Sequence, residues 1–182
     1  MYQKIVIVGV SGSGKSTLAG QLSKRIQVPV TELDALYWQD DWQSVSEAEF
    51  TEQVKKKVLQ DRWILCGNYN RVRETIWDSA DTLIWLDYSF FKVFFRLLFR
   101  SIQRAWTREK LWETNNQESF LKTFFSKDSI VLWMIQTHGR YRAQYPKLIE
   151  ETKQKNPRIK ILRFQSESQL RHWMKSLSVN AL

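Results

Sequence analysis

The residues with the clearest chemical meaning lie near the start of the chain. Residues 9–16 read Gly-Val-Ser-Gly-Ser-Gly-Lys-Ser, which is the spacing G-x-x-x-x-G-K-S/T of a phosphate-binding loop, or P-loop. Glycines let backbone N–H groups turn toward a bound anion, and the helix that follows adds partial positive charge. In this pattern Lys15 reaches the β- and γ-phosphates, and the Ser16 hydroxyl binds Mg²⁺. The sequence therefore predicts a site for a nucleoside triphosphate and Mg²⁺.

The setting of the loop supports this prediction. An apolar run at residues 5–8 directly precedes it, and a helical pattern follows it. A buried strand, a glycine-rich turn and a helix are the context in which this motif binds phosphate. We expect the phosphate contacts to come from Gly9, Ser11, Gly12, Ser13, Gly14, Lys15, Ser16 and Thr17.

Apolar runs and helical patterns alternate along the rest of the chain. Strands are predicted at residues 4–8, 28–33, 63–66, 82–87 and 159–164, and helices at 15–26, 48–59, 90–104, about 119–153 and 169–177. Capping boxes at Ser46 and Ser166 support two of the helix starts. This alternation predicts an α/β protein with the three-layer P-loop NTPase fold, in which helices cover both faces of a five-stranded parallel sheet.

The 182 residues are most economically one domain. Within it we expect an acceptor-binding insertion at about residues 35–60 and a lid at about 100–120. The polar stretch 107–119 has no strong period, which is typical of lids and binding segments.

Asp34 is the leading candidate for catalysis, because it follows the predicted second strand. A carboxylate there could accept the proton of an acceptor hydroxyl or hold a Mg²⁺-bound water. The alternative is an aspartate that caps a helix or shapes a turn. Trp38 follows it and could stack on a base or pack a lid over the core.

A row of arginines lies on one face of the helix predicted at 90–104 and continues past its end. Arg96, Arg100, Arg104 and Arg108 recur every four residues. The planar guanidinium donates two parallel hydrogen bonds to phosphate, and like charges at this spacing favour an anionic partner. A solvated basic face remains the alternative.

Composition limits the partners and the compartment. Lys and Arg together number 28 against 19 Asp and Glu, a formal charge of +9 that suits nucleotides or nucleic acid. Cys66 is the single cysteine, which excludes an intramolecular disulfide and fits a reducing compartment. The chain enters its first strand without a signal peptide, and the apolar run at 90–100 is too short to span a bilayer. We expect a cytoplasmic protein without a membrane partner.

These features together resemble the adenylate-kinase-like group of small P-loop kinases, and within it the DNA topology modulation (FlaR-related) proteins. The resemblance rests on the P-loop, on the arginine-spaced helix, and on segments 33–38 with Trp42, 63–69, 80–87 and 125–133. It implies a nucleoside-monophosphate-kinase-like fold with a helical lid, and ATP rather than GTP as the nucleotide. It also implies that Arg96, Arg100 and Arg104 close on the γ-phosphate, and that Arg142, or Arg140 beside it, completes the transfer site.

One departure from this group concerns the turn after the third strand. Adenylate-kinase-like enzymes read Asp-Gly-Phe there, with the aspartate near Mg²⁺, whereas this chain has Cys66 at the aspartate position. A thiol is a poor Mg²⁺ ligand, so either Asp34 or Asp87 supports the Mg²⁺ through its bound waters or the hydrolytic power is reduced. The neighbouring candidates for acceptor binding are Gly67, Asn68, Tyr69 and Arg71. For Asn68 the alternative is a tight turn, and for Arg71 a solvated side chain.

The sequence thus favours a kinase that transfers the γ-phosphate of Mg·ATP to a small acceptor such as a nucleoside or nucleotide. A GTPase is disfavoured because the chain lacks an Asn-Lys-x-Asp segment. Two alternatives stay open: a nucleotide-dependent DNA-binding protein, suggested by the positive charge and the family name, and a slow ATPase with a protein partner. The acceptor itself is not predicted.

Overall fold

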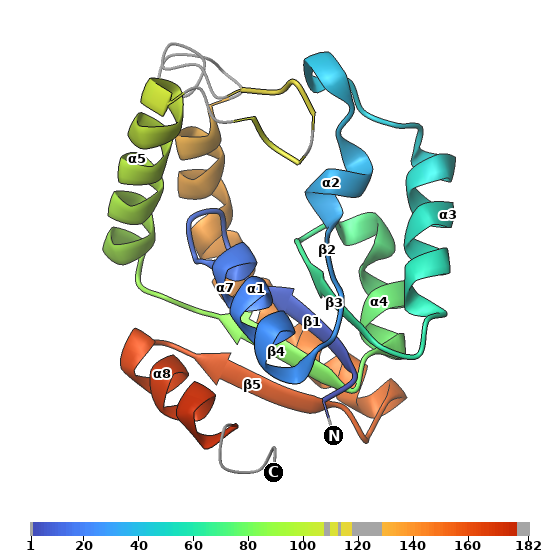
Figure 1. The fold of residues 1–182 in the computed structure, drawn as a ribbon. Helices are drawn as coiled ribbons and strands as arrows, with labels where there is room; N and C mark the ends of the chain where they lie inside the picture. Colours follow the sequence, from blue (N-terminus) through green and yellow to red (C-terminus); the bar gives the residue numbers. More distant parts are fainter. Residues whose placement is uncertain (1, 108–109, 113, 118–128, 178–182) are drawn as a thin grey trace.

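A parallel sheet lies at the centre of the molecule in a computed structural model that describes residues 2–107, 110–112, 114–117 and 129–177 (Figure 1). Its strands are β1 (Lys4–Val8), β2 (Val30–Glu32), β3 (Trp63–Cys66), β4 (Thr82–Leu86) and β5 (Lys160–Phe164). They are arranged in the order β2-β3-β1-β4-β5, and every pair is parallel. The predicted five-stranded parallel sheet is confirmed.

The strand order creates a switch point at the carboxyl edge of the sheet. The chain leaves β1 toward β2 on one side, while β4 and β5 lie on the other. Ligands of open α/β sheets bind beside such a point, just beyond the carboxyl ends of the strands. The P-loop and the segments after β2, β3 and β4 all begin at this edge.

Helices cover both faces of the sheet. They are α1 (Lys15–Ile26), α2 (Leu33–Tyr37), α3 (Glu47–Val58), α4 (Arg73–Ser79), α5 (Phe90–Thr107), α7 (Ile130–Lys155) and α8 (Glu167–Ser176), with 3₁₀ turns η1 (Asp40–Trp42) and η2 (Asn70–Val72). Ser46 accepts a hydrogen bond from the Glu49 N–H, and Ser166 accepts one from the Gln169 N–H. The two predicted helix starts, with Ser46 and Ser166 as N-caps, are therefore confirmed.

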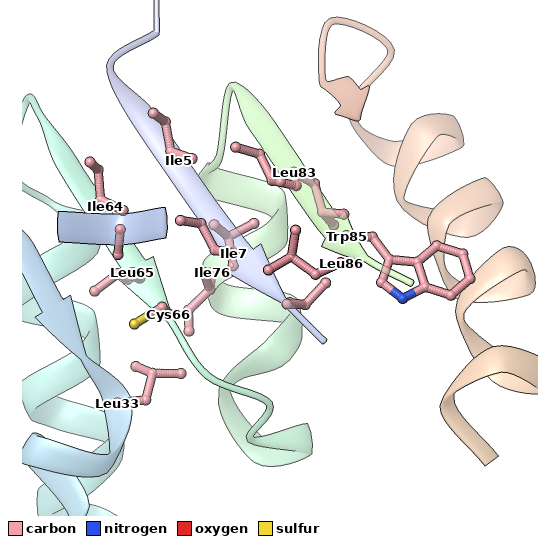
Figure 2. Packing of buried hydrophobic residues seen from close by; sticks show 14 of the residues in the cluster. Ile5, Ile7, Leu33, Ile64, Leu65, Cys66, Ile76, Leu83, Trp85 and Leu86 are labelled. Atoms are coloured by element: carbon pink, nitrogen blue, oxygen red, sulfur yellow. The ribbon is translucent and has the colours of Figure 1, made fainter. Parts of the chain in front are cut away.

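The core is continuous across the sheet because the central strands are buried on both faces. Ile5 and Ile7 of β1, like Leu83 of β4, are completely buried, as expected for strands between two helical layers (Figure 2). At one side of the cluster Trp85 points toward α7, where its ring meets Tyr145 at 5.4 Å. Unbroken apolar runs in the sequence therefore match the strands that the layers enclose.

The largest differences from the sequence prediction lie at three places. β2 ends at Glu32, and Asp34 lies in the first turn of α2 rather than at a strand end, because Leu33 and Leu36 are spaced to face the core from a helix. The seven residues of α4 were not predicted, since so short a helix shows no clear period. Of the helix predicted at about 119–153, Ile130–Lys155 is helical and residues 119–128 lie outside the described chain.

None of the described helices is long and apolar enough to cross a membrane.

Candidate functional site

The P-loop joins β1 to α1 and leaves the start of that helix open. Gly14 occupies the N-cap position with φ 91°, and no side chain caps the helix there. The first N–H groups of a helix lack partners within it, so they are available to an anion together with the positive end of the helix dipole. Lys15 folds back over the loop, where Nζ donates to the carbonyls of Gly9 (2.8 Å) and Val10 (3.2 Å).

Helix α5 supports the loop from outside. A Cβ atom built on Gly12 would lie 2.9 Å from Cβ of Leu97 and 2.9 Å from the carbonyl oxygen of Val93. The backbone at Gly12 also has φ +82°, which side-chain-bearing residues rarely adopt. Only glycine allows the loop to pack this closely on α5.

The turn after β3 holds the first residue of the loop. Asn68 Oδ1 accepts from the N–H of Gly9 (3.1 Å), and Asn68 Nδ2 donates to the carbonyl of Gly9 (2.5 Å). Gly67, just before it, packs against Leu33, to which a built Cβ would come within 2.9 Å. Asn68 therefore joins the ends of β3 and β1 at the switch point.

Asp34 lies opposite Lys15, at the start of α2. Burial raises the pKa of the Asp34 carboxyl, although the Tyr69 hydroxyl, which donates to Oδ1 at 2.6 Å, and the charge of Lys15 act in the other direction. Burial also lowers the pKa of Lys15, and the Asp34 carboxylate opposes that change. A partly buried acid and base thus face each other beside the P-loop.

The arginines of α5 extend this cluster of charges. Arg100 acts on both Lys15 and Asp34, lowering the pKa of each. Arg96 lies over the start of α1, with Nη1 3.8 Å from a Cβ built on Gly14. Arg104 is half-buried one turn beyond Arg100, and Arg108 lies outside the described residues. The structure thus brings Arg96 and Arg100 next to the loop.

Arg96 also has a carboxylate partner at the start of α8. It forms an ion pair with Glu167, which pairs in addition with Lys92 and Arg171 at 3.3 Å each. Although desolvation acts the other way, these cations lower the pKa of Glu167. That Arg96 closes on a γ-phosphate stays a prediction, since its guanidinium would have to serve both anions.

Asp87, at the end of β4, belongs to a different cluster. Its buried carboxylate accepts from Arg142 Nε (2.8 Å) and from Arg163 Nη2 (2.5 Å). Arg142 therefore contacts Asp87, and its contact with the nucleotide stays a prediction. Arg163 was missed by the sequence analysis because a single arginine in a strand carries no signal of its partner. Asp87 is therefore held by two arginines, and its role near Mg²⁺ as an alternative to Asp34 stays a prediction.

Cys66 is a neutral thiol beside the P-loop. Burial raises its pKa to about 12, and the Ser16 hydroxyl lies within hydrogen-bonding reach of the thiol. Glu32 of β2 lies beside Cys66 of β3 in the sheet, and its negative charge raises the pKa of Lys15. A neutral thiol does not suit Mg²⁺, whereas the oxygens of Ser16, Asp34 and Glu32 are the hard donors that this ion prefers. The donor set therefore fits Mg²⁺ bound together with ATP.

The predicted acceptor insertion presents aromatic rings. Trp38 contacts Tyr37 and Trp42 edge to face, with ring centroids 4.9 and 5.7 Å apart. Arg71 forms an ion pair with Glu47 of α3 at the surface. These contacts hold the insertion together, and the predicted acceptor contacts of Trp38, Tyr69 and Arg71 stay predictions.

Residues 110–112 and 114–117, which we call the strap, contact the predicted insertion from the side of the predicted lid. Trp112 Nε1 donates to Glu32 Oε2 (3.1 Å). Asn116 Oδ1 accepts from the Trp42 N–H (2.7 Å), and its Nδ2 donates to the Gln39 carbonyl (2.7 Å). The strap therefore connects the lid with β2 and η1. Glu32, Trp112 and Asn116 were not predicted from the sequence, because each meets a partner that is distant in the chain.

Few known proteins resemble this chain in sequence. No family model matches the chain. One curated protein, the uncharacterized protein YqaC of Bacillus subtilis (strain 168), is 35% identical over 69 residues, which are 37% of this chain and 39% of that protein. The match thus spans about two-fifths of the relative's length.

Solved structures resemble the whole chain. Shikimate kinase from Bacteroides thetaiotaomicron superposes with a TM-score of 0.55 at 15% identity, covering 97% of this chain and 99% of that one. Shikimate kinase from Acinetobacter baumannii in complex with shikimate gives 0.52 at 11%, covering 100% and 97%. A gluconokinase from Sinorhizobium meliloti 1021 gives 0.50 at 13%, covering 99% and 98%. The chain therefore has the α/β fold of small P-loop kinases, and the resemblance to the DNA topology modulation proteins stays a prediction.

Proposed function

We propose that the protein is a kinase that transfers the γ-phosphate of Mg·ATP to a small acceptor, such as a nucleoside or nucleotide. One observation carries the proposal. The positive charges of Lys15 and Arg100 both lower the pKa of Asp34, and this cluster lies beside an uncapped helix start at the end of the P-loop. Two cations flank the place where phosphates would lie, and a carboxylate faces them from the acceptor side. That arrangement suits phosphoryl transfer, in which positioning and charge stabilisation supply most of the catalysis.

The P-loop side would bind the nucleotide. Backbone N–H groups of the loop and of the first turn of α1 would donate to phosphate oxygens. The Lys15 ammonium would leave the Gly9 and Val10 carbonyls for the β- and γ-phosphates. Mg²⁺ neutralises the phosphates when it is bound with ATP, and Ser16 and Glu32 are the residues that would hold it, which leaves Asp34 to the acceptor.

Asp34 would act on the acceptor. With its pKa raised by burial, the carboxylate is a stronger base than an exposed aspartate, and Tyr69 orients it through the 2.6 Å hydrogen bond. The acceptor hydroxyl would give its proton to Asp34 as its oxygen bonds to the γ-phosphorus. The bond from that phosphorus to the β–γ bridging oxygen breaks, and ADP leaves. Arg100, with Arg96 and Arg104, would stabilise charge on the transferred group.

The kinases of like fold support the reaction type. A gluconokinase and two shikimate kinases share the architecture over nearly the whole chain. At 11–15% identity they do not identify the acceptor.

Release of ADP from Mg·ATP tests the proposal. Purified protein would be assayed alone, with a panel of nucleosides, nucleoside monophosphates and sugar acids, and with duplex DNA. We expect ADP release that depends on one small-molecule class and is lost in Lys15→Ala. The matched control Lys24→Ala removes an exposed lysine of the same helix and should keep full activity.

Other outcomes would contradict the proposal. ADP release stimulated by DNA alone would favour a nucleic-acid-dependent ATPase. Equal rates with and without every acceptor would indicate a simple ATPase. A Lys15→Ala variant as active as Lys24→Ala would remove the P-loop from the reaction.

A further inference from the structure

Helix α5 exposes a row of large apolar side chains on the side away from the P-loop. Phe91, Phe95, Phe99, Ile102 and Trp106, which we call the α5 stripe, are 71, 51, 68, 42 and 89% exposed. Their spacings of four, four, three and four residues put them on one face of the helix. From the second member onward, these are the spacings of a coiled-coil seam. Figure 1 places α5 at the margin of the molecule.

The opposite side of α5 explains why this stripe is not needed for the fold. Val93, Leu97 and Ser101 are buried, and the first two pack on Gly12 of the P-loop. On the third side Phe90 contacts His138 of α7, with ring centroids 5.4 Å apart. The helix is therefore fixed by two faces, and the α5 stripe adds a third face that is apolar and exposed.

The stripe continues onto the neighbouring helix. Ile135 of α7 is 46% exposed and lies one turn before His138, which puts it on the side of α7 that faces α5. Together these side chains expose roughly 700–750 Å² of surface, because a large aromatic side chain carries about 200 Å². The largest apolar patch on an ordinary monomer is about 300–600 Å². A stable protein–protein interface buries about 800 Å² on each partner.

Charge on this face favours a protein partner over a lipid surface. A helix that lies on a membrane has lysines and arginines along the edges of its apolar face. Lys92 and Arg96 instead turn to Glu167, and Arg100 acts on Lys15 and Asp34. The exposed polar neighbours of the stripe on α5 are the uncharged Gln103 and Thr107. An uncharged centre is typical of the core of a homodimer interface.

We propose that the α5 stripe is the interface between two copies of this chain, which pair α5 against α5 about a twofold axis. A stripe that is apolar from end to end is self-complementary under such an axis, since each residue meets an apolar residue of the partner copy. The area available is close to that of one side of a stable interface. Because each α5 also supports Gly12 and carries Arg96 and Arg100, the pairing joins the backs of two P-loop sites.

The oligomeric state of the full chain tests this proposal independently of any enzymatic activity. Sedimentation velocity from about 1 to 100 μM would be compared for the wild type, Phe99→Glu and Trp106→Glu. We expect the wild type at twice the chain mass of 21.8 kDa and both variants at the single mass. Leu59→Glu is the matched control, because Leu59 is 80% exposed at the end of α3 and lies outside the stripe. This variant should remain a dimer.

Thermal unfolding followed by circular dichroism would verify that each variant is folded. Trp106, the most exposed member, lies in the last turn of α5, so its substitution keeps the test valid if Phe99→Glu does not fold. A wild-type protein at the single mass throughout would overturn the proposal, as would a folded Trp106→Glu variant that stays dimeric. A further outcome is a monomeric wild-type protein that sediments with phosphatidylserine vesicles while Trp106→Glu does not. That result would also overturn the proposal, in favour of a lipid surface.

Discussion

Asn68 holds Gly9, the first residue of the P-loop, through both groups of its amide. Oδ1 accepts from the Gly9 N–H at 3.1 Å, and Nδ2 donates to the Gly9 carbonyl at 2.5 Å. The same carbonyl accepts from Lys15 Nζ at 2.8 Å. The turn after β3 therefore fixes both the start of the loop and the resting position of its lysine.

Replacing Asn68 should weaken both the fold and nucleotide binding. In Asn68→Ala, the Gly9 N–H loses the side chain that accepts from it and the Gly9 carbonyl keeps only Lys15, which should lower the free energy of unfolding by about 1–3 kcal/mol. ATP affinity should fall several-fold because the loop is less ordered. Urea unfolding and titration calorimetry measure these effects. Asn70→Ala, two residues further on at an exposed site, is the control; equal losses in both variants would contradict a specific role for Asn68.

Gly12 and Gly20 should respond oppositely to alanine. At Gly12 a Cβ would lie 2.9 Å from Leu97 Cβ and Val93 O, so Gly12→Ala must displace the loop from α5. We expect a loss of about 2 kcal/mol or more in stability. Gly20 lies inside α1 with no atom within 4 Å of the built Cβ, so Gly20→Ala should stabilise by roughly 0.5–1 kcal/mol. Chemical unfolding would decide, and a stable, ATP-binding Gly12→Ala protein would contradict the close packing.

The sheet was predictable because burial on both faces leaves a simple trace in the sequence. Runs such as residues 5–8 and 63–66 are apolar throughout, and the structure buries them completely. Elements at the edge of the fold gave weaker signals. β2 has three half-buried residues, and α2 and α4 are too short for a period, so Asp34 was expected at a strand end and lies in a helix.

The site was predictable where its chemistry is local in the chain. The P-loop is contiguous, and the arginines of α5 are one helical turn apart. Glu32, Trp112 and Arg163 were not predictable, because their roles depend on partners distant in the sequence: Trp112 meets Glu32 across 80 residues, and Arg163 meets Asp87 across 76. Such pairs form only when the chain folds, and no regular spacing in the sequence indicates them.

Asp34→Asn should separate stability from activity. Burial raises the pKa of Asp34, so its stabilising contribution is present in full below the ordinary aspartate pKa and is lost as the pH rises through the folded value. At pH 7, above the ordinary aspartate pKa, that contribution is partly or fully lost, so Asp34→Asn should raise the melting temperature. This gain should shrink as the pH falls toward 4. In the proposed kinase reaction, kcat should fall by about 10²–10⁴.

The exposed Asp61 offers a matched control for this substitution. Asp61→Asn should leave both the melting temperature and its pH dependence as in the wild type. A melting temperature of Asp34→Asn below that of the wild type at pH 7 would show that the carboxylate, with Tyr69 and Lys15, stabilises the fold in its charged form.

Cys66 should be inert in the folded protein. With its pKa raised to about 12 by burial, about 10⁻⁴ of the thiol is ionised at pH 8, and its side chain is 3% exposed. Alkylation by iodoacetamide should therefore be slower by at least about a hundredfold in native buffer than in urea. Mass spectrometry of timed samples gives both rates. Rapid labelling of the native protein at neutral pH would contradict a buried, neutral thiol.

Asn116 should hold the strap onto the acceptor insertion. Its side chain is buried, accepts from the Trp42 N–H and donates to the Gln39 carbonyl, both at 2.7 Å. In Asn116→Ala both backbone groups lose their partner, so the strap should detach more often and trypsin should cleave after Lys110 several-fold faster. Gln117→Ala, at the exposed next position, should be cleaved as the wild type is. In the proposed reaction, a loosened strap should raise the acceptor KM more than the ATP KM, because the hydrogen bonds of Trp112 and Asn116 run to β2 and η1. Equal cleavage of both variants would mean that the Trp112–Glu32 contact alone retains the strap.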